Sequence, residues 1–254
     1  MASRKRDTPL RREKIEADAC SPALRLRILS ELPFFEGLAE RDLERINARF
    51  RDLGFHTGDT IAREGDRAER LYIVAVGTVR LSRYAEPGQS LLVDVLGTGD
   101  FFGGMAGYGL SRNPDTATAL TSSCLISIGT DHFREIIVRH PSVALRTVER
   151  LSARLDTARE MLRQLMGFSA SQRLSFVLLR LAARLGEARD GETLIQTPLS
   201  REDLAAMAGT TTETASRVLS ELSRQGIIRS GRGWVAIRDS EALSAEIPNS
   251  RGLD

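Results

Sequence analysis

Three polar residues, Glu213, Ser216 and Arg217, are spaced so that a helix would place them on one face. A guanidinium can donate two hydrogen bonds to a guanine edge, a carboxylate can accept one from a cytosine amino group, and a serine hydroxyl can meet a thymine. The combination therefore indicates side chains that read base edges in a major groove. A second interpretation stays open, in which Thr210 and Glu213 form a capping box and Glu213 bonds the backbone instead.

Residues 200–224 predict a helix, a glycine turn and a second helix that together would position these side chains. Ser200 is expected to cap the first helix, and Gly209 to supply a turn with a positive φ. The second helix is expected to begin at Thr210 or Thr211. Apolar residues at helical spacing supply the inner faces of both helices: Leu204, Ala205, Ala208, Ala215, Val218, Leu219 and Leu222. This pattern predicts a helix-turn-helix, whose second helix enters the major groove.

A predicted hairpin follows the second helix, with strands over 227–229 and 234–237 and a turn over 230–233. In this position the hairpin is a wing, and Arg232 at its tip suits a phosphate contact. Further phosphate contacts are expected at the starts of the two helices, from Ser200, Arg201, Thr210, Thr211 and Thr212.

Short strands separated by glycines are expected over 60–62, 71–76, 78–81, 91–96 and 120–128, after short helices over 23–30 and 39–50. Evenly spaced short strands predict an all-β barrel or jelly roll. Such a barrel either holds a small ligand or is filled by its own side chains.

A long helix is expected after Pro141, and its apolar residues recur in alternating steps of four and three: Ala144, Val148, Leu151, Leu155, Ala158, Leu162 and Leu165. This spacing is a heptad seam and favours a parallel homodimer. The alternative is a helix that simply lies on the barrel.

The 254-residue chain is thus expected to comprise five segments: a basic arm (1–22), a β-roll (23–139), a dimerisation helix (140–167), a winged helix-turn-helix domain (168–240) and a tail (241–254). Residues 186–192 are expected to form a loop. A net charge of +2 gives no global attraction to nucleic acid, so any such attraction must come from local patches.

Several classes of protein are not favoured by the sequence. No apolar run approaches the roughly 20 residues that span a bilayer, and no signal peptide is evident, so a cytoplasmic protein is expected. Cys20 and Cys124 are expected to stay unpaired, and neither they nor the histidines have the spacing of metal ligands. No nucleophile–base pair indicates an enzyme.

The order of β-roll, dimer helix and winged helix-turn-helix resembles the cyclic AMP receptor protein/fumarate-nitrate regulator (Crp/Fnr) superfamily over residues 32–239. The resemblance is carried by Phe34-Phe35-x-Gly37-Leu38, Gly58-Asp59, Glu64-Gly65-Asp66, Gly99-Asp100-Phe101-Phe102-Gly103 and Glu213-Thr214-Ala215-Ser216-Arg217. It implies an α+β fold with a cyclic-nucleotide-binding-like β-roll. It also implies a homodimeric transcription regulator that senses a small-molecule effector and has double-stranded DNA and RNA polymerase as partners.

The pattern Glu-x-x-Ser-Arg at residues 213–217 is similar to the fumarate-nitrate branch of this superfamily. Thr212 and Ser216 stand where the receptor-protein branch carries an arginine and a glycine. The resemblance implies a TTGAT-like half-site, and two-fold symmetry of the protein would require it to be repeated as a palindrome.

The sensing end departs from the family cassette Phe-Gly-Glu…Arg-Ser-Ala, because Gly104 replaces the glutamate and Asp115 the arginine. A carboxylate repels a phosphate, so cyclic AMP is not expected as the effector, although Arg112 could compensate. Any effector pocket is expected around Gly103, Gly104, Met105, Arg112, Asp115 and Thr116.

No cofactor is expected. An iron–sulfur cluster needs four thiolates, and the chain has two cysteines. Haem stays open through His56, His132 or Met105, and Cys124 is either a redox sensor or an inert small hydrophobe. The rival to DNA binding is a ligand-binding or scaffold module whose helix-turn-helix mediates protein contacts.

Overall fold

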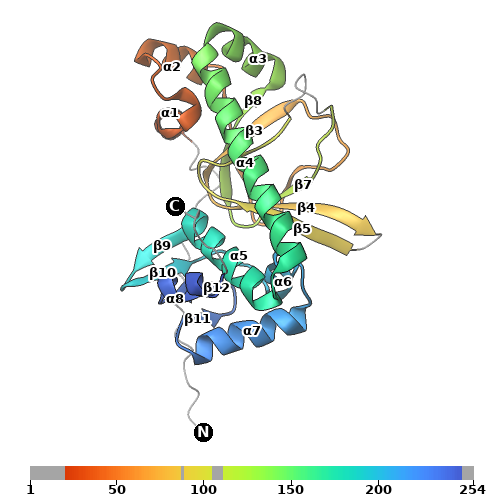
Figure 1. Ribbon diagram of the computed structural model, residues 1–254. Coiled ribbons are helices and arrows are strands. Elements are labelled where there is room, and N and C mark those ends of the chain that lie inside the picture. The colour runs from red at the N-terminus through yellow and green to blue at the C-terminus, as the bar shows by residue number, and fades with distance from the viewer. Residues whose placement is uncertain (1–20, 87–88, 105–110, 248–254) are drawn as a thin grey trace. The chain divides into compact units, whose positions relative to one another are not determined.

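The computed structural model describes residues 21–86, 89–104 and 111–247 (Figure 1). They form an N-terminal unit and a C-terminal unit, with the boundary between Met166 and Gly167. The expected basic arm and Met105 lie outside the described residues. None of the described helices is long and apolar enough to cross a membrane.

The N-terminal unit begins with three short helices, α1 (Pro22–Glu31), η2 (Pro33–Phe35) and α2 (Glu40–Asn47). Ser21 caps α1 by accepting a hydrogen bond from the amide of Leu24. Arg25 then ties α1 to the next elements, because its guanidinium donates to Asn47 at 2.6 Å and to Asp52 at 2.8 Å. Helix α2 ends at Asn47, three residues before the end predicted for it at residue 50.

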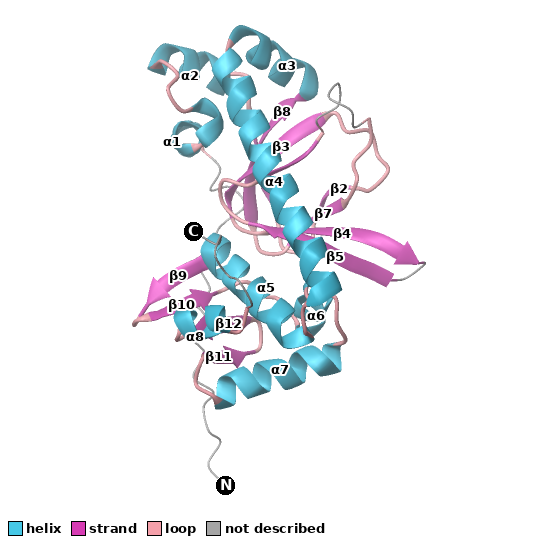
Figure 2. Cartoon of the chain, in the orientation of Figure 1, coloured by secondary structure: helices cyan, strands magenta, loops and turns pink. Residues whose placement is uncertain are grey.

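Eight strands build the barrel: β1 (Arg51–Phe55), β2 (Thr60–Ala62), β3 (Arg70–Val76), β4 (Val79–Glu86), β5 (Gln89–Leu96), β6 (Phe101–Gly103), β7 (Thr116–Ala119) and β8 (Ser123–Gly129). They form two antiparallel sheets with the orders β1-β8-β3-β6 and β2-β7-β4-β5. Figure 2 shows strands of both sheets, among them β3 and β8 of the first and β4 and β5 of the second. This arrangement confirms the predicted jelly roll. The strand predicted over 120–128 is β8, which begins three residues later than predicted, at Ser123.

The barrel's own side chains pack into its interior. One buried cluster comprises Val74, Val79, Leu96, Phe102, Ala117 and Leu125. Tyr72 stacks on Phe102 with the ring centroids 5.1 Å apart, and Phe34 meets Phe101 edge-on at 4.9 Å. The second of these contacts fixes η2 against β6.

Two helices follow the barrel, α3 (Thr130–Arg139) and the long α4 (Pro141–Gly167). Val143 of α4 belongs to the barrel-side core, and Arg154 donates from Nη2 to the Phe101 carbonyl at 2.7 Å. The Arg154 guanidinium also lies 4.2 Å from the centroid of the Phe101 ring, a cation–π distance. These contacts hold α4 across the barrel (Figure 1).

The heptad seam lies on a different face of α4 and is exposed. Val148, Leu151, Leu155, Leu162 and Leu165 are each between 41% and 61% exposed. Thus α4 does lie on the barrel, but through residues other than the seam, and the seam remains available for a partner helix.

The C-terminal unit contains α5 (Ala170–Leu185), β9 (Gly186–Arg189), β10 (Glu192–Ile195), α6 (Arg201–Met207), α7 (Thr212–Arg224), β11 (Ile228–Gly231), β12 (Trp234–Ile237) and α8 (Ser240–Ala245). Its strands form one sheet in the order β11-β12-β10-β9. The loop predicted over 186–192 is wrong: β9 turns into β10 through Asp190 and Gly191, both with a positive φ, as type I′ hairpin turns require. Helix α8 lies in the segment expected to be a tail, and its Leu243 is buried.

Cys124 forms a disulfide bond, so the expectation that it stays unpaired is wrong. Its side chain is buried within β8. The other cysteine of the sequence, Cys20, lies outside the described residues.

Candidate nucleic-acid interface

Helix α6 begins at a complete capping box. The Ser200 hydroxyl accepts from the amide of Asp203 at 3.0 Å and donates to its carboxylate at 2.7 Å, and that carboxylate accepts from the amide of Ser200 at 2.8 Å. The predicted cap is confirmed. The same bonds commit the Ser200 hydroxyl hydrogen to Asp203, so at a phosphate the amides of Arg201 and Glu202, which the capping box does not use, are the freer donors.

The turn between the two helices has the predicted geometry, with Gly209 at φ 56°. Sequence reasoning missed the side chain that holds this turn. Arg173 of α5 donates to the carbonyls of Ala208 at 2.7 Å, Gly209 at 3.1 Å and Phe168 at 2.6 Å. A single guanidinium therefore satisfies carbonyls left free at the end of α6, and it fastens the turn to α5.

Helix α7 begins at Thr212, capped by Thr211, whose hydroxyl accepts from the amide of Thr214 at 3.2 Å. The alternative box between Thr210 and Glu213 is therefore wrong. Because the cap lies one residue later, Glu213 is released from a capping role and stands exposed on the first turn.

The two faces of α7 separate as predicted. Ala215, Leu219 and Leu222 are buried, and Val218 is half-buried. On the opposite face Glu213 and Arg217 are exposed, and within the described part of the chain neither side chain has a hydrogen-bond or ion-pair partner. Ser216 lies between them, half-buried, and Thr212 is exposed in the first turn.

Charges at the other end of α7 behave differently. Arg224 and Glu221 form an ion pair at 2.6 Å, whose hydrogen bond raises the pKa of Arg224 and lowers the pKa of Glu221. The charges of the last turn thus neutralise each other. The charged side chains of the first two turns, Glu213 and Arg217, keep their hydrogen-bonding groups available for another molecule.

The wing consists of β11 and β12, joined by the two residues Arg232 and Gly233. Gly233 has φ 77°. A Cβ at Gly231 would overlap the indole of Trp234, so glycine allows the tryptophan to lie against this strand. Arg232 is exposed at the tip and has no side-chain partner within the described residues, as a phosphate contact requires.

Two polar contacts brace the base of the wing. The Glu192 carboxylate of β10 pairs with Arg229 at 2.7 Å and with Arg238 at 3.1 Å. Arg201, predicted as a phosphate contact, donates from Nη2 to the Ser230 hydroxyl at 3.2 Å. Its Nη1 is buried without a partner in the described structure, and burial lowers the pKa of Arg201. An anion beside Arg201 would offset that cost of desolvation.

The described residues of the expected effector pocket make contacts that bear on the family cassette. A Cβ at Gly104 would overlap the carbonyl of Ala68, so the backbone leaves no room there for the family's glutamate. Gly103 has φ 89°, and a Cβ on it would lie 2.6 Å from the Arg70 carbonyl oxygen. These two glycines allow the close approach of two backbone segments.

Asp115 is held by Arg83 of β4, with an ion pair of 3.0 Å. Burial raises the pKa of Asp115, and the Arg83 charge and hydrogen bond oppose that rise. Arg112, which could compensate for the missing arginine, donates from its Nη1 to the Gly65 carbonyl at 2.6 Å. The Thr116 hydroxyl accepts from the amide of Glu64 at 3.1 Å. His56 and His132, considered as haem ligands, are both exposed.

Two family models match the chain: the cyclic nucleotide-binding domain over residues 53–140 and the Crp-like helix-turn-helix domain over residues 172–246. The cyclic AMP receptor protein of Thermus thermophilus is 33% identical over 83% of this chain and 94% of its own length. The CRP-like cAMP-activated global transcriptional regulator of Mycobacterium tuberculosis is 28% identical over 85% of this chain and 97% of its own length.

Among solved structures, FixK2 from Bradyrhizobium japonicum matches with a TM-score of 0.70 and 24% identity. The match covers 78% of this chain and 98% of FixK2, and it concerns the fold.

Proposed function

Because the chain belongs to the CRP/FNR family of transcription regulators, we propose that it binds a TTGAT-like palindrome in double-stranded DNA as a homodimer. The observation that carries this proposal is the exposed face of α7, where Glu213 and Arg217 have no partner in the described structure. Both are charged groups held on a rigid helix, so they are ready to exchange water for base edges.

Each polar residue of this face has one role in the proposal. Arg217 donates to a guanine, Glu213 accepts from a cytosine amino group, and Ser216 meets a thymine. Backbone amides at the starts of α6 and α7, together with Arg201 and Arg232, contact phosphates and fix the register of the helix on the groove. Thr210 and Thr212 supply hydroxyls to the same phosphate contacts, and Thr211 positions the amides of the first turn by capping α7.

The dimer is proposed from the seam on α4. Five large apolar side chains between 41% and 61% exposed on one helical face are costly to leave in water. A parallel partner helix buries them and brings two copies of α7 to half-sites about one helical turn apart.

Cyclic AMP is not proposed as the effector. The site lacks space for a side chain at Gly104, and Arg83 already pairs with Asp115. We propose a regulator without a cofactor that acts in the cytoplasm together with RNA polymerase. It is controlled by another small molecule or by its own abundance.

The test compares Arg217→Ala with Arg224→Ala, an arginine of the same helix that is paired with Glu221. Arg217→Ala should weaken binding to the palindrome by about 1–3 kcal/mol, roughly 5- to 150-fold, and change binding to scrambled DNA little. Arg224→Ala should leave the ratio of the two affinities unchanged. Equal loss by Arg217→Ala on both DNAs would remove its base-reading role.

A salt series separates DNA reading from the scaffold alternative. A sequence-specific protein keeps its preference for the palindrome as salt rises, while the phosphate component of both affinities falls. A scaffold module would show no preference between the two DNAs at any salt concentration.

A further inference from the structure

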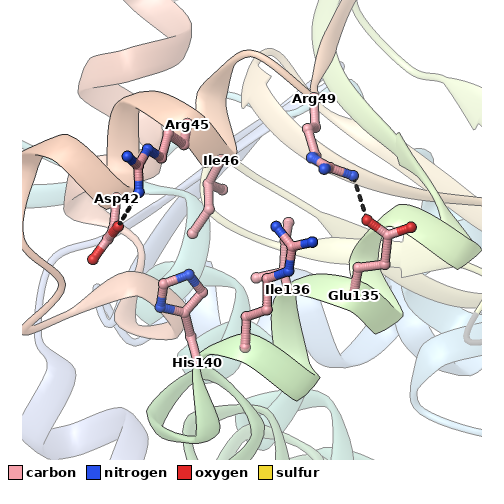
Figure 3. A pocket seen from close by; sticks show the side chains of 8 residues that line it. Asp42, Arg45, Ile46, Arg49, Glu135, Ile136 and His140 are labelled. Atoms are coloured by element: carbon pink, nitrogen blue, oxygen red, sulfur yellow. Dashed lines mark hydrogen bonds and ion pairs between the residues drawn. The ribbon is translucent and has the colours of Figure 1, made fainter.

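A cavity of about 190 Å³ opens between α2 and α3 of the N-terminal unit (Figure 3). No residue of the proposed DNA-reading face or of the expected effector pocket lines it. A space of this size is large enough for several water molecules or for one small organic molecule.

The cavity has an apolar floor. Ile46 of α2 and Ile136 of α3 face it from opposite sides, and both are almost fully buried. Because little of either side chain is exposed to water, an apolar group that enters the cavity would gain mainly van der Waals contact with them.

Two ion pairs line the walls. Arg45 pairs with Asp42 within α2 at 3.5 Å, and Arg49 bridges to Glu135 of α3 at 2.6 Å (Figure 3). Both carboxylates of the lining therefore already face a guanidinium, and neither carries an unbalanced negative charge.

Arg139 and His140 complete the lining and differ from the other charged residues. Within the described residues neither side chain has a hydrogen-bond or ion-pair partner. Arg139 is the last residue of α3, so the carboxyl end of that helix supplies up to about half a negative charge nearby. The three guanidiniums of the lining outweigh its two carboxylates and this partial charge, so the cavity keeps a net positive charge.

We propose that this cavity binds a small organic anion, with a carboxylate on Arg139 and a short apolar body on Ile46 and Ile136. A carboxylate can accept two parallel hydrogen bonds from one guanidinium, and His140 can donate a further bond. The apolar floor selects an organic anion over a bare inorganic one.

The position of the cavity gives such a ligand a route to the dimer helix. His140 is the C-cap of α3, and Pro141 is the first residue of α4. A ligand held by α2 and His140 would thus restrain the joint between α3 and α4. This site is independent of the DNA-reading residues, so its failure would leave the proposed function intact.

The experiment uses the full chain with ¹³C-labelled isoleucine methyl groups and three probes: benzoate, its neutral isostere benzamide, and inorganic phosphate. Benzoate should shift the methyl signals of Ile46 and Ile136 and leave Ile195 and Ile237 of the C-terminal unit unchanged. Its dissociation constant should be at least about tenfold lower than those of benzamide and phosphate, the fold-change that corresponds to 1.4 kcal/mol.

Arg139→Gln should weaken benzoate binding at least about tenfold, as loss of a charge-assisted bidentate contact predicts. Arg134→Gln removes an exposed arginine of the same helix that does not line the cavity, and it should have little effect. The proposal is overturned if the two variants weaken binding equally. It is also overturned if benzamide or phosphate binds as tightly as benzoate, or if no probe shifts Ile46 and Ile136.

Discussion

Replacing Arg173 by alanine should destabilise the C-terminal unit, because this side chain bonds three backbone carbonyls around the helix-turn-helix. A hydrogen bond to a charged group contributes a net 1.5–3 kcal/mol, but the guanidinium is half-buried and the freed carbonyls regain some water. We therefore expect a loss of about 2–4 kcal/mol in the free energy of unfolding, below the sum of three full bonds.

The assay is urea unfolding followed by tryptophan fluorescence. Trp234 is the only tryptophan of the chain and lies in β12 of the same unit, so its signal reports the relevant transition. With an m-value of about 1–2 kcal/mol/M, the midpoint should fall by roughly 1–4 M. Arg173→Lys should recover less than half of the loss, because one ammonium cannot reach three carbonyls in fork geometry.

The control is Arg224→Ala, which removes an exposed intrahelical ion pair and should cost at most about 0.5 kcal/mol. If Arg173→Ala costs no more than this control, the guanidinium does not hold the turn, and the reasoning fails.

Three further outcomes are expected. Leu155→Asp places a charge at an exposed seam position, so sedimentation should show monomer in place of dimer without loss of helicity; an unchanged dimer contradicts the seam. Gly104→Glu should lower the calorimetric stability of the N-terminal unit by roughly 2–4 kcal/mol and create no cyclic AMP binding. Burial raises the pKa of Asp115, so the folded state holds a proton that the unfolded state has lost, and this contribution to stability falls as pH rises from the ordinary value through the raised pKa. Asp115→Asn should flatten that pH dependence in urea titrations, and an equally steep dependence in the variant would refute the assignment.

The DNA-reading end could be predicted from sequence because its signals are local. Ser200 and Asp203 lie three residues apart, and Gly209 marks a turn that needs a positive φ. The Arg173 contacts could not be predicted, since they join a side chain to backbone carbonyls 35 and 36 residues away that carry no residue-type signal. Asp190-Gly191 is a residue pair typical of a hairpin turn. The short strands beside it lack a clear alternation of apolar residues, so they could not be predicted as strands.

The sensing end was predictable only as a departure from a pattern. Sequence shows that Gly104 and Asp115 differ from the family cassette, but it does not show what replaces the missing interactions. Arg83 reaches Asp115 across adjacent strands from a position 32 residues earlier, and Ala68 fills the space above Gly104. Both contacts depend on the closure of the barrel.

If the exposed seam on α4 forms the proposed dimer, it has a consequence for gene dosage. Below the dissociation constant of the dimer, the concentration of dimers rises with the square of the total protein concentration. Occupancy of a palindrome by a pre-formed dimer then follows the same square law. A twofold change in expression would produce about a fourfold change in occupancy at unsaturated sites. The four leucines and one valine that form this face would thus sharpen the response of target genes to synthesis and degradation of the regulator, with no ligand involved.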